Sequence, residues 1–246
     1  MTKVSKFPFR LAQGYRDFLV GRMPTERERY RELATRGQSP NVMVIGCCDS
    51  RVSPEVIFDA HPGELFVVRN IANLVPPFTS DGTCHGVFAA LEFAVQVLGV
   101  RHIVVLGHAR CGGIRAYAEH GPPLSPADSI HKWMSLIAPA AELAGAPGGE
   151  DYLTRLEQAS IGMSLENLLT FPYVAAAAEQ GALQLHGATS TSRPTSCPYA
   201  MSTAIVKSAL SPRTSAGVMR LARGRHRLSS VRPARGDNGN LVWQAQ

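Results

Sequence analysis

Three short apolar runs, at residues 41–46, 65–68 and 102–107, limit most strictly what this chain can fold into. Runs of this length that are almost wholly apolar are typical of strands buried on both faces of a sheet. Residues 84–98 have the apolar spacing of a helix, and residues 111–113 are expected to open another helix after the third run. Strands that alternate with helices predict an α/β fold, with a central, mainly parallel sheet flanked by helices.

Further helices are expected on either side of this alternation. Residues 14–36 are predicted to be helical with an interruption near Pro24, which gives the fold an N-terminal helical arm. Residues 129–144 and 150–180 are expected to be mainly helical, and residues 181–187 could add one more short strand.

The positive charge of the chain is concentrated at its C-terminal end. The formal net charge is +6, but residues 188–246 hold nine Lys or Arg residues against Asp237 alone, which leaves −2 on residues 1–187. The last segment is also rich in Ser, Pro and Gly and lacks periodicity. We therefore predict a folded domain at 1–187 and a basic tail at 188–246 that is either disordered or frameshifted. No nucleic-acid partner is expected, although a binding role for the tail is a minor alternative.

Five cysteines, an odd number, argue against a framework of disulfides. The chain has no apolar stretch long enough to span a membrane, and its first residues lack the apolar segment of a signal peptide. We expect a cytoplasmic protein with no membrane partner. Reduced cysteines in such a protein ligate metals, carry out redox chemistry or pack in the core.

Three potential metal ligands follow two of the predicted strands. Cys47 comes directly after the first strand, and His108 and Cys111 come after the third. Loops at the carboxyl ends of parallel strands meet in one crevice, so these side chains can converge. Two thiolates and one imidazole suit zinc, and three protein ligands leave a fourth position open, as in catalytic sites. Zinc in such a site lowers the pKa of bound water and supplies hydroxide at neutral pH.

Asp49 and Arg51 lie close to the first of these ligands in the sequence. In an extended chain, alternate side chains point the same way, so both would share one side with Cys47. An ion pair with Arg51 would hold Asp49 off the metal and orient it to accept a hydrogen bond from the zinc-bound water.

The order Cys-x-Asp-Ser-Arg at 47–51 and His-x-x-Cys-Gly-Gly at 108–113 resembles the signature of the β-class carbonic anhydrases. The similarity extends through residues 64–75, 164–168 and 185–187 and covers roughly residues 25–187. The resemblance implies zinc bound by Cys47, His108 and Cys111, an Asp49–Arg51 dyad beside it, and reversible hydration of CO2 to bicarbonate and a proton.

The resemblance also implies a substrate pocket and an assembly. Gln38 and Phe66 match residues that line the CO2 pocket, partly across a dimer interface, in a family of homodimers and larger homo-oligomers. Some members carry an inhibitory bicarbonate pocket built with a Trp and a Tyr. Here these positions are Val44 and Phe93, so this control is not expected, although Arg69 remains.

The chain departs from the family after residue 187, where an aromatic residue, a turn and a closing edge strand normally follow. Instead it reads Ala-Thr-Ser-Thr-Ser-Arg-Pro, and the loss of an edge strand would leave apolar sheet exposed. A zinc-binding scaffold or thiol sensor without hydratase activity is therefore the alternative to an active enzyme.

Overall fold

The sheet that carries the candidate site belongs to the first of two compact units, Met1–Leu210 and Ser211–Gln246. In the computed structural model, the described residues are 7–80, 86–119, 126–149 and 151–191, with the short strands at 200–202, 234–235 and 241–242. The second unit contributes an antiparallel pair, β6 (Ala234–Arg235) and β7 (Leu241–Val242). Every site residue predicted from the sequence lies in the first unit.

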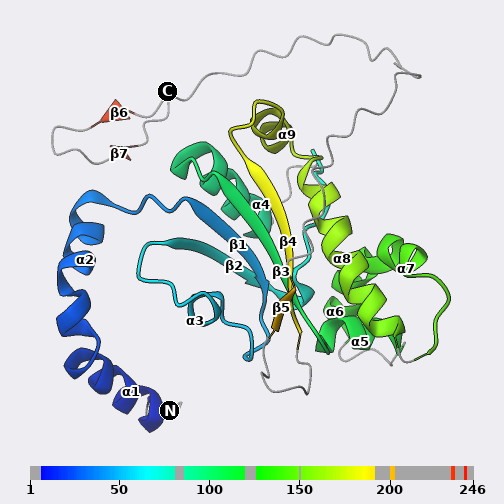
Figure 1. The fold of residues 1–246 in the computed structure, drawn as a ribbon, viewed down its shortest axis with the longest axis horizontal. Helices are drawn as coiled ribbons and strands as arrows, with labels where there is room; N and C mark the ends of the chain where they lie inside the picture. The colour runs from blue at the N-terminus through cyan, green and yellow to red at the C-terminus, as the bar shows by residue number, and fades with distance from the viewer. Residues whose placement is uncertain are drawn as a thin grey trace. The chain divides into compact units, whose positions relative to one another are not determined.

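Four parallel strands form the sheet in the order β2-β1-β3-β4, and β5 lies antiparallel beside β4 (Figure 1). Their bounds are β1 (Val42–Cys47), β2 (Leu65–Asn70), β3 (His102–His108), β4 (Gln184–Thr191) and β5 (Ala200–Ser202). This order confirms the predicted α/β fold with a mainly parallel sheet. Because β1 and β3 are neighbours, the loops that follow them lie next to each other at the carboxyl edge.

Helices and short turns surround the sheet (Figure 1). They are α3 (Pro54–Ile57), η1 (Ile71–Asn73), α4 (Gly86–Glu92), η2 (Phe93–Leu98), α5 (Gly112–Ala118), α6 (Ser129–Met134), η3 (Ser135–Ile137), α7 (Ala138–Ala144), α8 (Tyr152–Leu168) and α9 (Pro172–Glu179). The predicted helix at 84–98 is thus confirmed from Gly86 onwards, but its second half, η2, is a π-helix.

Both faces of the sheet are apolar, which explains why its strands are continuous apolar runs. On one face, Ile45 of β1 and Val105 of β3 are fully buried in a cluster with residues of α4, α8 and α9. On the other face, Val44 and Leu106 join Ala188 of β4 in a smaller cluster. Neighbouring residues of one strand therefore point into different parts of the core.

A further buried cluster supports the carboxyl edge of the sheet, where the candidate ligands lie. It joins Cys47 and Cys111 to apolar residues of α5, α6, α7 and α8. The start of α5 approaches η1 closely there, since a Cβ atom on Gly113 would lie 2.7 Å from Cγ2 of Ile71. A glycine at this position lets α5 begin directly beside the site.

The N-terminal arm consists of α1 (Phe9–Val20) and α2 (Met23–Arg36). The predicted interruption is confirmed: the helices break at Gly21 and Arg22, and Pro24 occupies the first turn of α2, where its missing N–H is harmless. Neither helix buries a residue, and large apolar side chains such as Phe9 and Tyr15 are exposed. Among the described residues, no helix is long and apolar enough to span a membrane.

The structure differs from expectation where the sheet ends. β4 does not stop near residue 187 but runs on to Thr191, so the expected domain boundary at 187 falls inside a strand. β5 then pairs with Thr189–Thr191, which supplies an edge strand from within the 188–246 segment. The expectation that a closing edge strand is missing is therefore corrected, because β5 lies at that edge. Most of this segment lies outside the described residues, and the proposed disorder or frameshift stays a prediction.

Candidate metal centre

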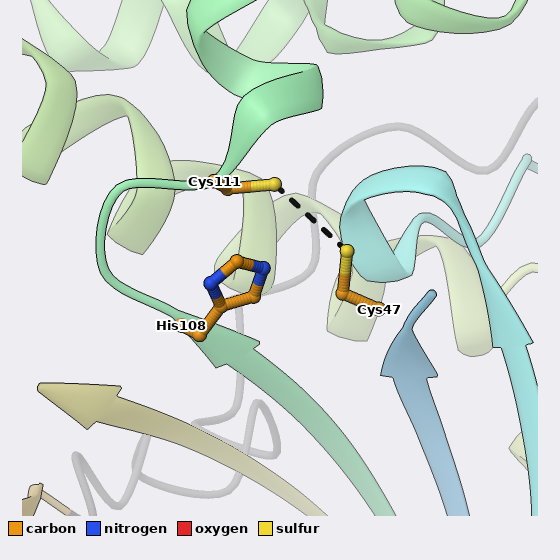
Figure 2. A group of neighbouring side chains, drawn as sticks. All are labelled: Cys47, His108 and Cys111. Carbon is orange, nitrogen blue, oxygen red and sulfur yellow. Dashed lines mark hydrogen bonds between the residues drawn. The ribbon is translucent and has the colours of Figure 1, made fainter. Parts of the chain in front are cut away.

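The three predicted metal ligands meet at the carboxyl edge of the sheet (Figure 2). Cys47 ends β1, His108 ends β3, and Cys111 directly precedes α5. Their ligand atoms all lie within 4.8 Å of one another, and the two Sγ atoms are 4.0 Å apart. Two sulfur ligands at tetrahedral angles and about 2.3 Å from a zinc ion would be separated by about 3.8 Å, so the observed spacing fits zinc.

The His108 ring is oriented for ligation. Its Nδ1–H donates to the carbonyl oxygen of Ala109 at 3.1 Å, because a carbonyl can only accept. Its Nε2 is buried and makes no hydrogen bond within the described part of the chain. A backbone contact at one ring nitrogen and a free lone pair at the other is the arrangement of metal-bound histidines. The donor set therefore fits a zinc ion.

The two thiols titrate differently because they lie so close together. The neighbouring Cys111 thiol is the largest influence on the pKa of Cys47 and lowers it, against burial. His108 and the backbone N–H groups of Asp49 and Ala72 act in the same direction. The pKa of Cys111 is raised, first by its hydrogen bond to Cys47 and then by burial. Cys47 is therefore the thiol that ionises first, and a bound cation would favour ionisation of Cys111 as well.

Asp49 and Arg51 form a two-point ion pair at the site. Arg51 donates from Nε to Oδ1 of Asp49 at 2.8 Å and from Nη2 to Oδ2 at 2.7 Å. Hydrogen bonding to Arg51 holds the pKa of Asp49 well below its usual range. Oδ2 also lies 3.9 Å from Nε2 of His108, so the carboxylate borders the metal group without belonging to it.

The predicted path of this segment was wrong, although the side chains do meet. The chain is not extended after Cys47: the N–H of Val52 donates to the carbonyl oxygen of Asp49 at 3.1 Å, which closes a turn. Within the turn, the N–H of Arg51 donates to Oδ1 of Asp49 at 3.0 Å. Asp49 and Arg51 therefore share one side because the backbone reverses, not because a strand alternates.

Arg69 supports the same segment from β2. Its Nε donates to the carbonyl oxygen of Cys47 and its Nη2 to that of Asp49, each at 2.8 Å. The guanidinium is thus occupied in holding the backbone on either side of Cys48. Val44, in contrast, lies within β1 and is fully buried in the cluster with Leu106 and Ala188.

Gln38 and Phe66 are not brought to the metal group of the same chain. Phe66 pairs with Met43, four residues before Cys47, which corresponds to about 13 Å along a strand. Gln38 is exposed and precedes β1, still further from its carboxyl end. Phe66 instead contacts Phe93 of η2, with ring centroids 5.9 Å apart. Both predicted pocket residues therefore lie towards the opposite edge of the sheet.

Two contributors to the site were missed from the sequence. Ala72 adopts a left-handed conformation (φ 63°) in η1, and its N–H points to the Cys47 sulfur. Glu157 of α8 is buried and accepts the N–H of Cys111. Ala72 gives no sequence signal, and Glu157 gives none either, because the nearby Gln158 and Ser160 are also polar.

The fold and the site together define a class of protein: α/β proteins with a buried Cys-His-Cys group, able to hold a metal ion, at the carboxyl edge of a parallel sheet. The carbonic anhydrase family profile matches residues 42–193, more than half of the chain. The chain belongs to the β-carbonic anhydrase family.

Individual relatives agree with this assignment. Over 186 residues the chain is 37% identical to β carbonic anhydrase 3 of Arabidopsis thaliana, covering 73% of this chain and 71% of that protein. Over 164 residues it is 42% identical to chloroplastic β carbonic anhydrase 5 of the same plant, covering 65% of this chain. The match spans 54% of that relative's length, about half of it.

Solved structures of the family share the fold. The β-carbonic anhydrase CcaA has a TM-score of 0.68 at 30% identity, over 74% of this chain and 82% of that one. A chain from the two tetrameric β-carbonic anhydrases of Sordaria macrospora has a TM-score of 0.63 at 28% identity, over 74% of this chain and 91% of that one.

Proposed function

We propose that this protein is a zinc-dependent carbonate dehydratase that hydrates CO2 reversibly to bicarbonate and a proton. The observation that carries the proposal is the buried group of Cys47, His108 and Cys111, with the Nε2 atom of His108 left without a hydrogen bond. Three ligands of this chemistry leave one coordination position for solvent, as in catalytic rather than structural zinc sites.

The ligands would hold a zinc ion whose charge lowers the pKa of a coordinated water molecule. Asp49 stays ionised at neutral pH because of its contacts with Arg51, so it can accept a hydrogen bond from solvent but cannot donate one. Both of its oxygens are engaged by Arg51, which fixes the direction of its remaining lone pairs. Asp49 would therefore select the orientation of the solvent molecule that attacks CO2.

The substrate pocket is proposed to form between two copies of the chain. Phe66 and Phe93 form an apolar contact that leaves Phe93 41% exposed, and Gln38 is exposed at the same edge of the sheet. Phe9 and Tyr15 on α1 are exposed as well, at 78% and 62%. A second copy packed against these apolar surfaces would bury them and bring Gln38 and Phe66 to the partner's metal centre.

Measurement of zinc content together with stopped-flow CO2 hydration tests the catalytic proposal on the full chain. We expect stoichiometric zinc and fast hydration, which Asp49→Ala abolishes while zinc is retained. Asp151→Ala, at an exposed position directly before α8 and outside the proposed interface, is the matched control and should behave as the wild type. Stoichiometric zinc without hydration would favour the zinc scaffold or thiol sensor instead.

A complementation experiment tests the shared pocket. The variants Asp49→Ala and Gln38→Ala are each expected to be poorly active alone. If the pocket crosses the interface, a mixed dimer contains one site with both Asp49 and Gln38, and free exchange restores about a quarter of wild-type activity. No recovery in a mixture shown by mass to contain mixed dimers would refute a shared pocket, and a monomeric wild type would refute the dimer.

A further inference from the structure

Glu157 is a buried acid on α8 whose carboxylate faces the metal loop. Its residue is only 7% exposed, and Oε1 accepts the backbone N–H of Cys111 at 2.9 Å. Burial of a carboxylate is costly unless the group is hydrogen-bonded. The chain therefore retains an ionisable group beside the metal loop, where an apolar side chain would otherwise suit the surrounding cluster.

The loop that Glu157 contacts has an unusual backbone. Arg110 lies between the ligands His108 and Cys111 and adopts a left-handed conformation (φ 56°), which is costly for a residue with a side chain. The backbone N–H groups of Arg110 and Cys111 both hydrogen-bond to Glu157. Successive N–H groups around a left-handed residue form a concave site for an anion, and here the Glu157 carboxylate occupies it.

We infer that Glu157 is a positioning residue of the metal centre, which fixes the Arg110–Cys111 turn so that the Cys111 sulfur faces Cys47 before a metal binds. This inference rests on the proposed function, in which these cysteines bind zinc. The hydrogen bonds described for the Glu157 carboxyl group come from the backbone N–H groups of Cys111 and Arg110, so it acts on the ligand Cys111 through the backbone. Its effect is pre-organisation: without it, zinc binding must also order the turn.

The substitution that isolates this role is Glu157→Gln, because it keeps the size and one acceptor oxygen but removes the charge and the second acceptor. Glu157→Leu removes both acceptors. The matched control is Glu166→Gln, which makes the same change at an exposed position nine residues further along α8. If the Leu variant fails to fold, the Gln variant alone still decides the question.

Three measurements on the full chain are needed, two with metal and one without. Competition with a chromophoric chelator gives the zinc affinity, which we expect to fall about 10-fold in Glu157→Gln and about 100-fold in Glu157→Leu. The cobalt-substituted protein should show shifted thiolate-to-metal absorption bands. In the chelated protein, hydrogen exchange at residues 109–113 should become faster in Glu157→Gln than in Glu166→Gln.

The outcomes separate the two proposals. Unchanged zinc affinity, cobalt spectrum and exchange in Glu157→Gln would overturn the positioning role while leaving the metal centre intact. Lower thermal stability with unchanged affinity and spectrum would also overturn it, because that result describes a merely structural residue. If the wild type binds no zinc, the proposed function fails; faster exchange of the loop in Glu157→Gln would then still report the contact with the turn.

Discussion

Arg51 donates two hydrogen bonds to the Asp49 carboxylate, from Nε at 2.8 Å and from Nη2 at 2.7 Å. Its Nη2 also donates to the carbonyl oxygen of Arg110 at 3.1 Å. The guanidinium thus connects the loop after β1 to the loop after β3. Cys47 and His108 end the strands that lead into these loops, and Cys111 lies in the second loop, so the ion pair is part of the frame of the site as well as of its chemistry.

Replacement of Arg51 by lysine should reduce activity without unfolding the protein. A lysine cannot make the two-point contact, so Asp49 loses its fixed orientation, and we expect kcat/KM for CO2 hydration to fall about 10- to 100-fold. The Arg51 side chain is 48% exposed, so the pair contributes little to stability and the melting temperature should change little. Arg31→Lys, which alters the exposed pair with Glu28, is the control. An unchanged rate would remove Asp49 orientation from the mechanism.

The adjacent cysteines at 47 and 48 provide a direct test of the ligand set. Cys47 is buried in the metal group, whereas Cys48 is an exposed free cysteine outside it. Cys47→Ser should lose zinc on dialysis, because a hydroxyl is a poor replacement for a thiolate ligand. Cys48→Ser should retain it. Metal analysis by mass spectrometry decides between them, and retention of zinc by Cys47→Ser would contradict the assigned ligands.

The neighbouring glycines at 112 and 113 should differ sharply in how well they tolerate substitution by alanine. A Cβ atom on Gly113 would lie 2.7 Å from Ile71 and 3.3 Å from both Ala72 and Met134, while one on Gly112 meets nothing within 4 Å. We expect Gly113→Ala to lower the free energy of unfolding by about 1–3 kcal/mol and to weaken zinc binding. Gly112→Ala should be nearly neutral. Urea denaturation of both variants is the measurement, and equal stabilities would refute the packing argument.

A pair of histidines away from the metal centre predicts a pH dependence of stability. Nδ1 of His102 on β3 lies 3.1 Å from Nε2 of His186 on β4, and burial, followed by the charge of His102, lowers the pKa of His186. The unfolded chain therefore binds the proton more tightly. The contribution of neutral His186 to the free energy of unfolding is complete above the ordinary histidine pKa of about 6.5. It is lost as the pH falls towards the lowered pKa of His186 in the folded protein.

Urea denaturation between pH 7.5 and 5 should show this loss, and His186→Gln should flatten the decrease. His61→Gln serves as the control, since the His61 side chain is 62% exposed and lies on a loop far from this pair in sequence. A decrease of the same steepness in His186→Gln and in the wild type would assign the pH dependence to other groups.

The sequence was sufficient for the architecture and for the meeting of Cys47, His108 and Cys111 in one group that could hold a metal ion. Buried parallel strands are short apolar runs, and the residues that follow them, such as Cys47 and His108, necessarily meet at one edge of the sheet. The zinc chemistry of this donor set then limited the site to a few functions.

The sequence was insufficient wherever the geometry depends on contacts distant along the chain. Glu157 meets Cys111 across 46 positions, and no local pattern indicates which helix will cover the loop. The turn at Asp49 was missed because the Asp49 side chain accepts the nearby backbone N–H of Arg51. Such a local hydrogen bond offers the backbone an alternative to extended structure. Gln38 was assigned by resemblance alone, and its distance from the metal edge follows only from the strand register.

β4 continues past residue 187, and this continuation connects the segment that departs from the family pattern to the metal ligand His108. Ser190 pairs with the ligand His108, and its carbonyl oxygen accepts the N–H of Ala109 at 2.9 Å. Changes in β4 after Gly187 therefore act on the metal loop through the backbone. The smallest fragment worth expressing as an independent enzyme extends at least to Ser202, where the last strand of the sheet ends.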